Sequence, residues 1–230
     1  MLAVGFDFDH TLGIDNKLER RVALEMLDEL ARTQAVSYDP ADAGAAVDEM
    51  LHQSRSGGMP LETALAGFFD RFVELGDKAP EVTEQYEQRV VALAPQLVEA
   101  LPGLHEMLAD LQNMGAPYAI LTNGWSPLQE EKARLVGFEG PVFVSERIGV
   151  RKPSREAFEF LAKHFGAPPA AVWYVGDDPA LDCAAARACG MTSVWFDWEG
   201  RSYPQELEPP NFVIHSLSEL PALLKVKIKE

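Results

Sequence analysis

Short apolar runs alternate with helix-length segments over the second half of this 230-residue chain, and this alternation constrains the fold most. Runs that predict strands lie at 2–8, 118–121, 172–175, 192–196 and 212–214, with a weaker one at 142–144. Segments that predict helices lie at 104–114, 127–136, 154–165 and 180–189. Because this alternation is typical of a parallel sheet covered by helices on both faces, the sequence predicts an α/β, Rossmann-like, doubly wound core.

The segment 15–95 breaks this pattern, because it contains no strand-like run and shows four helix signals in succession. The signals are Asn16 with Glu19 as a capping pair, Asp39 followed by Pro40, a helix start at Pro60, and a last helix over 81–93. We therefore expect an inserted all-α domain of four helices at 15–95. The α/β core then comprises 1–14 and 96–230.

Charge and hydropathy exclude several classes of partner. The chain has 36 acidic and 20 basic residues and a formal net charge of −16, which argues against binding a nucleic-acid backbone. No apolar run approaches the roughly 20 residues that a membrane helix needs, and no basic segment precedes the first apolar run. We expect a cytoplasmic protein with a small-molecule ligand and no membrane or nucleic-acid partner, as a monomer or a homodimer.

Chemistry-bearing side chains follow the predicted strands at the points where ligands collect in such sheets. Asp7 and Asp9 follow the first strand, and the segment 122–124, Thr-Asn-Gly, follows the second. Lys152 precedes a proline and a helix, and the segment 177–182 carries three aspartates after a further strand. Each group alone is also typical of a turn, a helix cap or a solvated surface.

Taken together, the order and spacing of these four groups resemble the haloacid dehalogenase superfamily, in its subfamily I with a helical C1-type cap. The resemblance covers roughly 1–14 and 97–200. It implies that Asp7 is a nucleophile, that Asp9 is a general acid and base, and that Thr122 offers a hydroxyl to a phosphate. Lys152 resembles the lysine that neutralises charge in this family.

The resemblance also implies a magnesium site. Asp177 would join the carboxylate of Asp7 and the backbone carbonyl of Asp9 around Mg²⁺. Asp182, Asp178 and Thr11 would support these ligands, Asp178 by coordinating through water. The chemistry calls for such groups, because an anionic phosphoryl group repels a carboxylate nucleophile unless cations lie beside both, and oxygen ligands suit Mg²⁺.

Substrate contacts are expected at the phosphate and in the inserted domain. Thr122, Asn123, Gly124 and Lys152 are candidates for binding the phosphate. Arg55, in the polar stretch 52–59, and Trp125 are weaker candidates for the rest of the substrate, although Trp125 equally suits packing. The closest resemblance within the superfamily is to nucleotidases and N-acylneuraminate-9-phosphatase, which indicates a subgroup and not a substrate.

The expected reaction is Mg²⁺-dependent hydrolysis of a small phosphomonoester through an aspartyl phosphate. Nucleoside monophosphates, sugar phosphates and phosphoglycolate are the expected types of substrate. A phosphosugar mutase uses the same nucleophile and stays open as an alternative, whereas a haloacid dehalogenase has no need of Asp9 as a proton donor. Two alternatives in which the protein is not an enzyme are a receiver-like phosphoacceptor and a binding protein.

Overall fold

The computed structural model describes residues 2–228 and divides into two compact units. The first, called here the sheet unit, comprises Met1–Ile14 and Glu99–Glu230, and the second, the helical unit, comprises Asp15–Val98. The second boundary differs from the expected residue 95, which lies inside a helix that ends at Leu97. Each unit has a buried apolar interior of its own.

Six parallel strands form the sheet, at the six runs that the sequence predicts. They are β1 (Ala3–Phe6), β4 (Tyr118–Thr122), β5 (Val142–Val144), β6 (Val172–Gly176), β7 (Thr192–Phe196) and β8 (Phe212–Ile214). Their order is β5-β4-β1-β6-β7-β8, with parallel pairing throughout. Because β1 lies between β4 and β6, the residues that follow these three strands emerge side by side.

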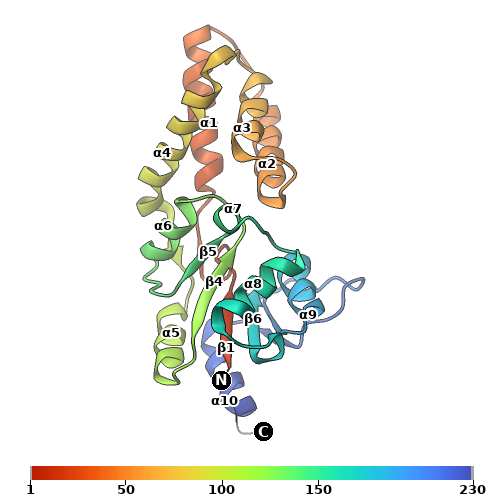
Figure 1. The fold of residues 1–230 in the computed structure, drawn as a ribbon. Coiled ribbons are helices and arrows are strands. Elements are labelled where there is room, and N and C mark those ends of the chain that lie inside the picture. Colours follow the sequence, from red (N-terminus) through yellow and green to blue (C-terminus); the bar gives the residue numbers. More distant parts are fainter. Residues whose placement is uncertain (1, 229–230) are drawn as a thin grey trace. The chain divides into compact units, whose positions relative to one another are not determined.

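Helices cover both faces of this sheet (Figure 1). They are α5 (Leu104–Asn113), α6 (Leu128–Leu135), α7 (Ser145–Ile148), α8 (Arg155–Phe165), α9 (Ala185–Ala188) and α10 (Leu220–Ile228). On one face Phe158 of α8 packs edge-on against Tyr174 of β6, with ring centroids 5.0 Å apart. The preceding residue of β6, Trp173, points to the other face and stacks on Phe212. The α/β doubly wound core is thus confirmed.

The segment after β6 departs from the expected continuous helix at 180–189. A π-helical turn, η3 (Pro179–Ala184), comes first and only then the short α9. The turn begins at Asp178, whose side chain accepts hydrogen bonds from the backbone N–H groups of Ala180 and Leu181. A local signal for the wider turn is absent from the sequence, because its composition is rich in alanine and suits an α-helix equally well.

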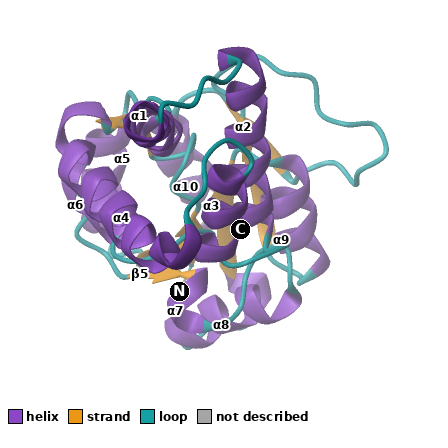
Figure 2. Ribbon diagram, turned by 90° about the horizontal axis from the view of Figure 1, so that it is seen from above, coloured by secondary structure: helices purple, strands orange, loops and turns teal. Residues whose placement is uncertain are grey.

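The helical unit is a four-helix bundle, as expected (Figure 2). Its helices are α1 (Leu18–Gln34), α2 (Pro40–Ser56), α3 (Leu61–Asp70) and α4 (Ala79–Leu97). Helix α1 packs against α4 and α2, and α3 packs against α2 and α4. Leu27, Leu65, Phe69 and Val90 are fully buried between them.

Short 3₁₀ turns lie at Gly76–Lys78 in the helical unit and at Pro169–Ala171 and Leu217–Glu219 in the sheet unit.

The predicted start of α1 is wrong, whereas that of α2 is confirmed. Asp39 caps α2 through its side chain, but α1 is preceded by Lys17 in the left-handed region with φ 62° and no side-chain cap. Asn16 instead donates from Nδ2 to the carbonyl of Leu97 at 2.8 Å, so it ties the first residues of the helical unit to its last helix.

One strand pair was not predicted. β2 (Gly13–Ile14) and β3 (Glu99–Ala100) pair antiparallel within the sheet unit, where the chain leaves it and returns. Two residues per strand are too few for a periodicity signal.

Within the described part of the chain, none of the helices is both long enough and apolar enough to cross a membrane.

Candidate active site

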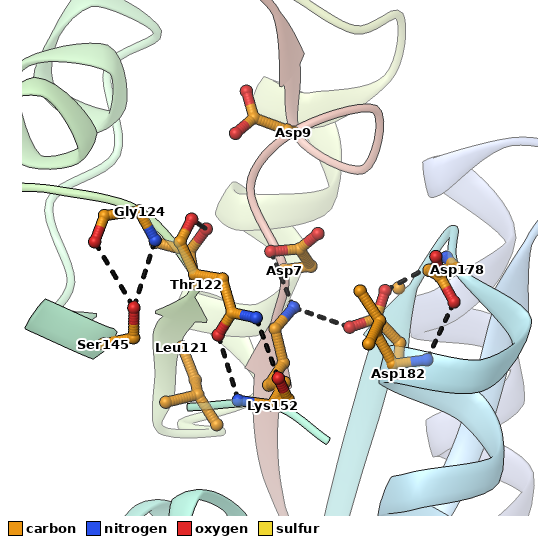
Figure 3. A network of polar contacts seen from close by, with 12 residues as sticks. Asp7, Asp9, Leu121, Thr122, Gly124, Ser145, Lys152, Asp178 and Asp182 are labelled. Carbon is orange, nitrogen blue, oxygen red and sulfur yellow. Dashed lines mark hydrogen bonds and ion pairs between the residues drawn. The ribbon is translucent and has the colours of Figure 1, made fainter. Parts of the chain in front are cut away.

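A buried lysine lies between two carboxylates at the ends of the central strands (Figure 3). Lys152 is 3% exposed, and its Nζ lies 2.9 Å from Oδ1 of Asp7 and 2.6 Å from Oδ1 of Asp182. Asp7 follows β1 directly, and its backbone N–H donates to the carbonyl of Val175 in β6. The parallel pairing of β1 and β6 therefore fixes where the Asp7 carboxylate lies.

Asn123 holds the backbone of Lys152 in place. Its Nδ2 donates to the Lys152 carbonyl and its Oδ1 accepts from the Lys152 N–H, both at 2.9 Å. This placement differs from the expected one, in which the Asn123 amide faces a phosphate. It gives Asn123 a different task, which is to fix the loop that carries the lysine to the turn that follows β4.

Asp182 is fully buried, and both of its oxygens are engaged. Oδ1 accepts from Lys152, and Oδ2 accepts from the backbone N–H of Asp178 at 3.0 Å. The side chain of Asp178 caps η3 by accepting hydrogen bonds from the backbone N–H groups of Ala180 and Leu181. Asp182 thus contacts Lys152 through one oxygen and the start of η3 through the other.

The Asp182 side chain packs against Gly176, the last residue of β6, so closely that the position admits no side chain. A Cβ added at Gly176 would lie 2.3 Å from the Asp182 carboxylate. We therefore expect Gly176→Ala to lower the free energy of unfolding by about 2–4 kcal/mol, measured by chemical denaturation. Gly67→Ala is the control, because a Cβ there meets nothing within 4 Å and alanine favours the helix. Equal stability of the two variants would contradict this packing.

Negative charge exceeds positive charge in this cluster. Burial opposes the charge of Lys152, but Asp182 and Asp7 outweigh it and raise the pKa of Lys152 well above its usual range. Burial raises the pKa of Asp182 to about 8 against the opposing effect of Lys152, and the charges of Asp7 and Asp177 add to the rise. We place the proton on Lys152, because its Nζ contacts two carboxylates. The remaining acidic charge favours a further cation.

Asp177 faces the same cluster from the residue after β6. Burial raises its pKa to about 6, and the charge of Asp7 adds to the rise. Two side chains contact Asp177. Trp195 of β7 donates from Nε1 to the Asp177 carbonyl at 2.9 Å, and Arg201, in the segment after β7, contacts Oδ2 of Asp177 at 3.2 Å. Arg201 also donates to the Asp177 carbonyl, so it fixes both the backbone and the carboxylate.

The donor set fits a magnesium ion. One carboxylate oxygen each from Asp7, Asp177 and Asp182 lies within 4.8 Å of the others, and all of these donors are the hard oxygen ligands that Mg²⁺ prefers. Because Lys152 and Asp178 engage both oxygens of Asp182, Asp7 and Asp177 suit direct ligation better. Among the described residues, no group of histidines or cysteines forms a second candidate metal site, and Cys183 and Cys189 are buried free thiols.

Asp9 lies apart from this cluster (Figure 3). Its Oδ1 is 2.9 Å from Nζ of Lys132, and its Oδ2 accepts from Nε2 of Gln129 at 3.2 Å. Both partners belong to α6 and are buried. The sequence had not singled them out. The only signal is their spacing of three residues on one face of the helix, which by itself is ordinary.

Other predicted residues lie at the end of β4 or next to β1. Thr122 is buried at the end of β4, and the Gly124 N–H donates to Oγ of Ser145, a further residue that the sequence had not singled out. Trp125 is 5% exposed and therefore packs in the interior. Oγ1 of Thr11 is buried with no hydrogen-bond partner among the described residues.

Arg55 lies on the last turn of α2 in the helical unit. Its Nη2 bonds Oε2 of Glu19 at 2.5 Å and lies 3.8 Å from Oδ2 of Asp15. Glu19 is 3% exposed, and its backbone carbonyl accepts from the Tyr86 hydroxyl. The Arg55 guanidinium, still half-exposed, is thus oriented by a buried carboxylate.

Comparison with known proteins identifies the family of this chain. The sequence pattern of a hydrolase family described as haloacid dehalogenase-like hydrolase matches residues 1–190. Phosphoserine phosphatase of Thermus thermophilus is 33% identical over 138 residues, which cover 58% of this chain and 53% of that protein. The chain thus spans about half the length of this curated relative.

Two further likenesses extend over nearly the whole chain. Phosphoglycolate phosphatase of Pseudomonas savastanoi pv. phaseolicola is 30% identical over 227 residues, covering 94% of this chain and 77% of that protein. The crystal structure of a HAD phosphatase from Thermococcus onnurineus matches with a TM-score of 0.75 and 23% identity, covering 97% of this chain and 98% of the other, which shows the shared fold. The chain belongs to the haloacid dehalogenase-like hydrolase family.

Proposed function

We propose that this protein is a Mg²⁺-dependent phosphatase that hydrolyses a small phosphomonoester at Asp7. The observation that carries the proposal is the contact between Asp7 and the buried Lys152, with Asp177 beside them. A phosphoryl group placed there would meet a nucleophilic oxygen and a fixed positive charge together. Thr122, at the end of the neighbouring strand β4, would supply a hydroxyl donor for a phosphate oxygen. Asn123 would hold the loop of Lys152 beside it, and Gly124 would complete the turn of this phosphate site.

The proposed reaction has two steps. A carboxylate oxygen of Asp7 attacks phosphorus, the ester P–O bond breaks, and the departing alcohol takes a proton from Asp9. Asp9 then takes a proton from water, whose oxygen attacks the aspartyl phosphate and releases inorganic phosphate and free Asp7. Asp7, Asp177 and the backbone carbonyl of Asp9 would hold Mg²⁺, which when bound offsets the charge of the phosphoryl group.

Asp9 also favours phosphoryl transfer over dehalogenation, because a dehalogenase needs no proton donor at that position. A phosphosugar mutase stays the second candidate, since it requires the same groups. The proposed substrate class is a small phosphate ester, supported by relatives named phosphoserine phosphatase and phosphoglycolate phosphatase that are 33% and 30% identical to the matched parts of this chain. Nucleoside monophosphates and sugar phosphates belong to the same class. We further propose that the helical unit acts as the cap that selects among them, with Arg55 as one contact.

A panel of phosphomonoesters tests this function. Phosphate release is measured with Mg²⁺ and with a chelator, on phosphoserine, phosphoglycolate, nucleoside monophosphates, sugar phosphates and N-acylneuraminate 9-phosphate. Release that requires metal supports the proposal and ranks the substrates. Isomerisation of a sugar phosphate in the presence of a bisphosphate activator, without net phosphate release, would favour the mutase. No turnover of any ester would contradict both.

Metal binding should depend on pH through Asp177. Because the folded-state pKa of about 6 exceeds the ordinary value of 3.8, the folded protein holds this proton more tightly than the unfolded chain does. In metal-free protein the stabilising effect is present at low pH and is lost as pH rises from about 4 to about 6, by at most about 3 kcal/mol. Mg²⁺ competes with the proton and should restore stability only above this range.

We therefore expect Mg²⁺ to raise the melting temperature clearly near pH 7.5 and hardly near pH 5, measured by differential scanning calorimetry. Asp177→Asn should remove the metal-induced rise at both pH values. Asp77→Asn, on an exposed turn of the helical unit, is the control and should retain it. An equal gain at both pH values in the wild type would show that Asp177 is no metal ligand.

A further inference from the structure

Two buried side chains of α6 hold the carboxylate of Asp9 at both of its oxygens. Lys132 has no exposed surface and contacts Oδ1, and Gln129, 2% exposed, donates to Oδ2. The Asp9 side chain itself is 21% exposed. A buried ammonium group is costly unless an anion compensates it, and a methionine would fill the same space at lower cost. Asp9 supplies such a compensating anion at 2.9 Å from the Lys132 ammonium.

The geometry of α6 makes this hold possible. Gln129 and Lys132 are three residues apart, so they lie on the same face of the helix. Gln129 also packs against the turn after β4: a Cβ added at Gly124, where φ is +149°, would lie 2.8 Å from Gln129 Nε2. One helix thus joins the turn that begins at Thr122 to the carboxylate of Asp9.

The loop that carries Asp9 fixes its backbone but not its side chain. The N–H groups of Thr11, Leu12 and Gly13 all donate to the carbonyl of Phe8, which closes the loop tightly. The Asp9 side chain keeps rotational freedom about its Cα–Cβ bond unless something outside the loop contacts it. The contacts from Lys132 and Gln129 remove that freedom.

We propose that Lys132 and Gln129 are positioning residues that set the orientation of Asp9, the proton donor and acceptor of the reaction. The effect of this positioning on catalysis rests on the proposed function, whereas the contacts of Lys132 and Gln129 with Asp9 do not depend on it. A carboxylate that must serve the leaving alcohol in one step and water in the next loses rate when its position is not fixed. In this proposal Lys132 and Gln129 affect the reaction through their contacts with the Asp9 carboxylate.

A double-mutant cycle tests this dependence. Lys132→Met should lower kcat about 10- to 100-fold with little change in KM, and Gln129→Met should lower it less. The double variant Asp9→Asn with Lys132→Met should be within about twofold of Asp9→Asn alone, because the lysine acts only through Asp9. Losses that multiply would overturn the proposal. Lys163→Met, on the exposed side of α8, is the control and should keep wild-type rates.

The leaving group gives a readout that a purely structural role would not change. An aryl phosphate whose phenol is acidic needs less help from a proton donor than an alkyl phosphate does. Two rates are therefore compared by rapid mixing: the burst of phenol from the aryl phosphate and single-turnover cleavage of the alkyl phosphate. Lys132→Met should slow the aryl reaction less than the alkyl reaction. Equal slowing for both esters would overturn the proposal.

A crystal structure of the Lys132→Met protein keeps the inference separate from the proposed function. We expect the Asp9 carboxylate to leave its present place, and Gln129→Met to shift it as well if Lys132→Met does not fold. An unmoved Asp9 would overturn the positioning role even if rates fall. If the wild type cleaves no ester, the proposed function fails, while the structure still decides whether these residues position Asp9.

Discussion

Asp7→Asn is expected to reduce phosphate release by at least about 10⁴-fold while leaving the protein folded. Asparagine keeps the shape of the side chain at the end of β1 but removes the nucleophilic oxygen anion. The backbone bond from residue 7 to Val175 persists, and Lys152 keeps Asp182 as a partner. The initial rate is measured at saturating substrate and Mg²⁺.

Asp77→Asn is the matched control for this substitution, because it makes the same chemical change on an exposed residue of the helical unit. It should retain the wild-type rate. Circular dichroism of both variants separates loss of catalysis from loss of fold. Wild-type turnover by a folded Asp7→Asn protein would show that another residue attacks phosphorus.

Lys152→Met is expected to damage both stability and turnover. Removing the ammonium leaves Asp182 fully buried and Asp7 beside it without their shared cation. Breaking a buried ion pair from one side costs about 3–5 kcal/mol, and we expect a loss of that size in chemical denaturation. Turnover should fall by about 10³-fold or more, because positive charge beside the phosphoryl group is lost.

A second substitution separates these two effects. Lys152→Met combined with Asp182→Asn removes the buried charge that the lysine compensated, so it should regain part of the lost stability. It should regain no turnover, because the cation beside Asp7 is still missing. Full activity in the double variant would contradict the role of Lys152. Unchanged stability in the single variant would contradict the ion-pair geometry.

The strands and their exits were predictable because they depend on local patterns. The run 172–175 is apolar at every position, which is typical of a strand covered on both faces, and Asp177 follows it directly. Asp7, Thr122 and Lys152 likewise stand next to strongly patterned elements. Parallel pairing then brings such residues together without further information from the sequence.

The contacts made by side chains were less predictable. A lysine on a helix ordinarily faces water, so the burial of Lys132 next to Asp9 could not be read from one sequence. Arg201 reaches Asp177 from an irregular segment after β7, whose path no periodicity describes. Asn123 shows the same limit, because its amide suits a phosphate and a backbone equally well, and only the fold places Lys152 beside it.

The start of α1 failed for a different physical reason. Asn16 and Glu19 have the spacing of a capping pair, but Asn16 and Lys17 both adopt positive φ, at 49° and 62°. This path directs the Asn16 side chain to Leu97 instead of to the first turn of α1. A contact across 81 residues thus prevails over a local signal.

Covalent labelling of Asp7 during turnover tests the central claim most directly. Wild-type protein is mixed with the best substrate of the panel and Mg²⁺, quenched in acid within the first turnover, digested and analysed by mass spectrometry. We predict that the peptide containing Asp7 carries the mass of one phosphoryl group, and that chelator or Asp7→Asn abolishes it. Phosphate release with no adduct at Asp7, or with an adduct on another residue, would contradict the account.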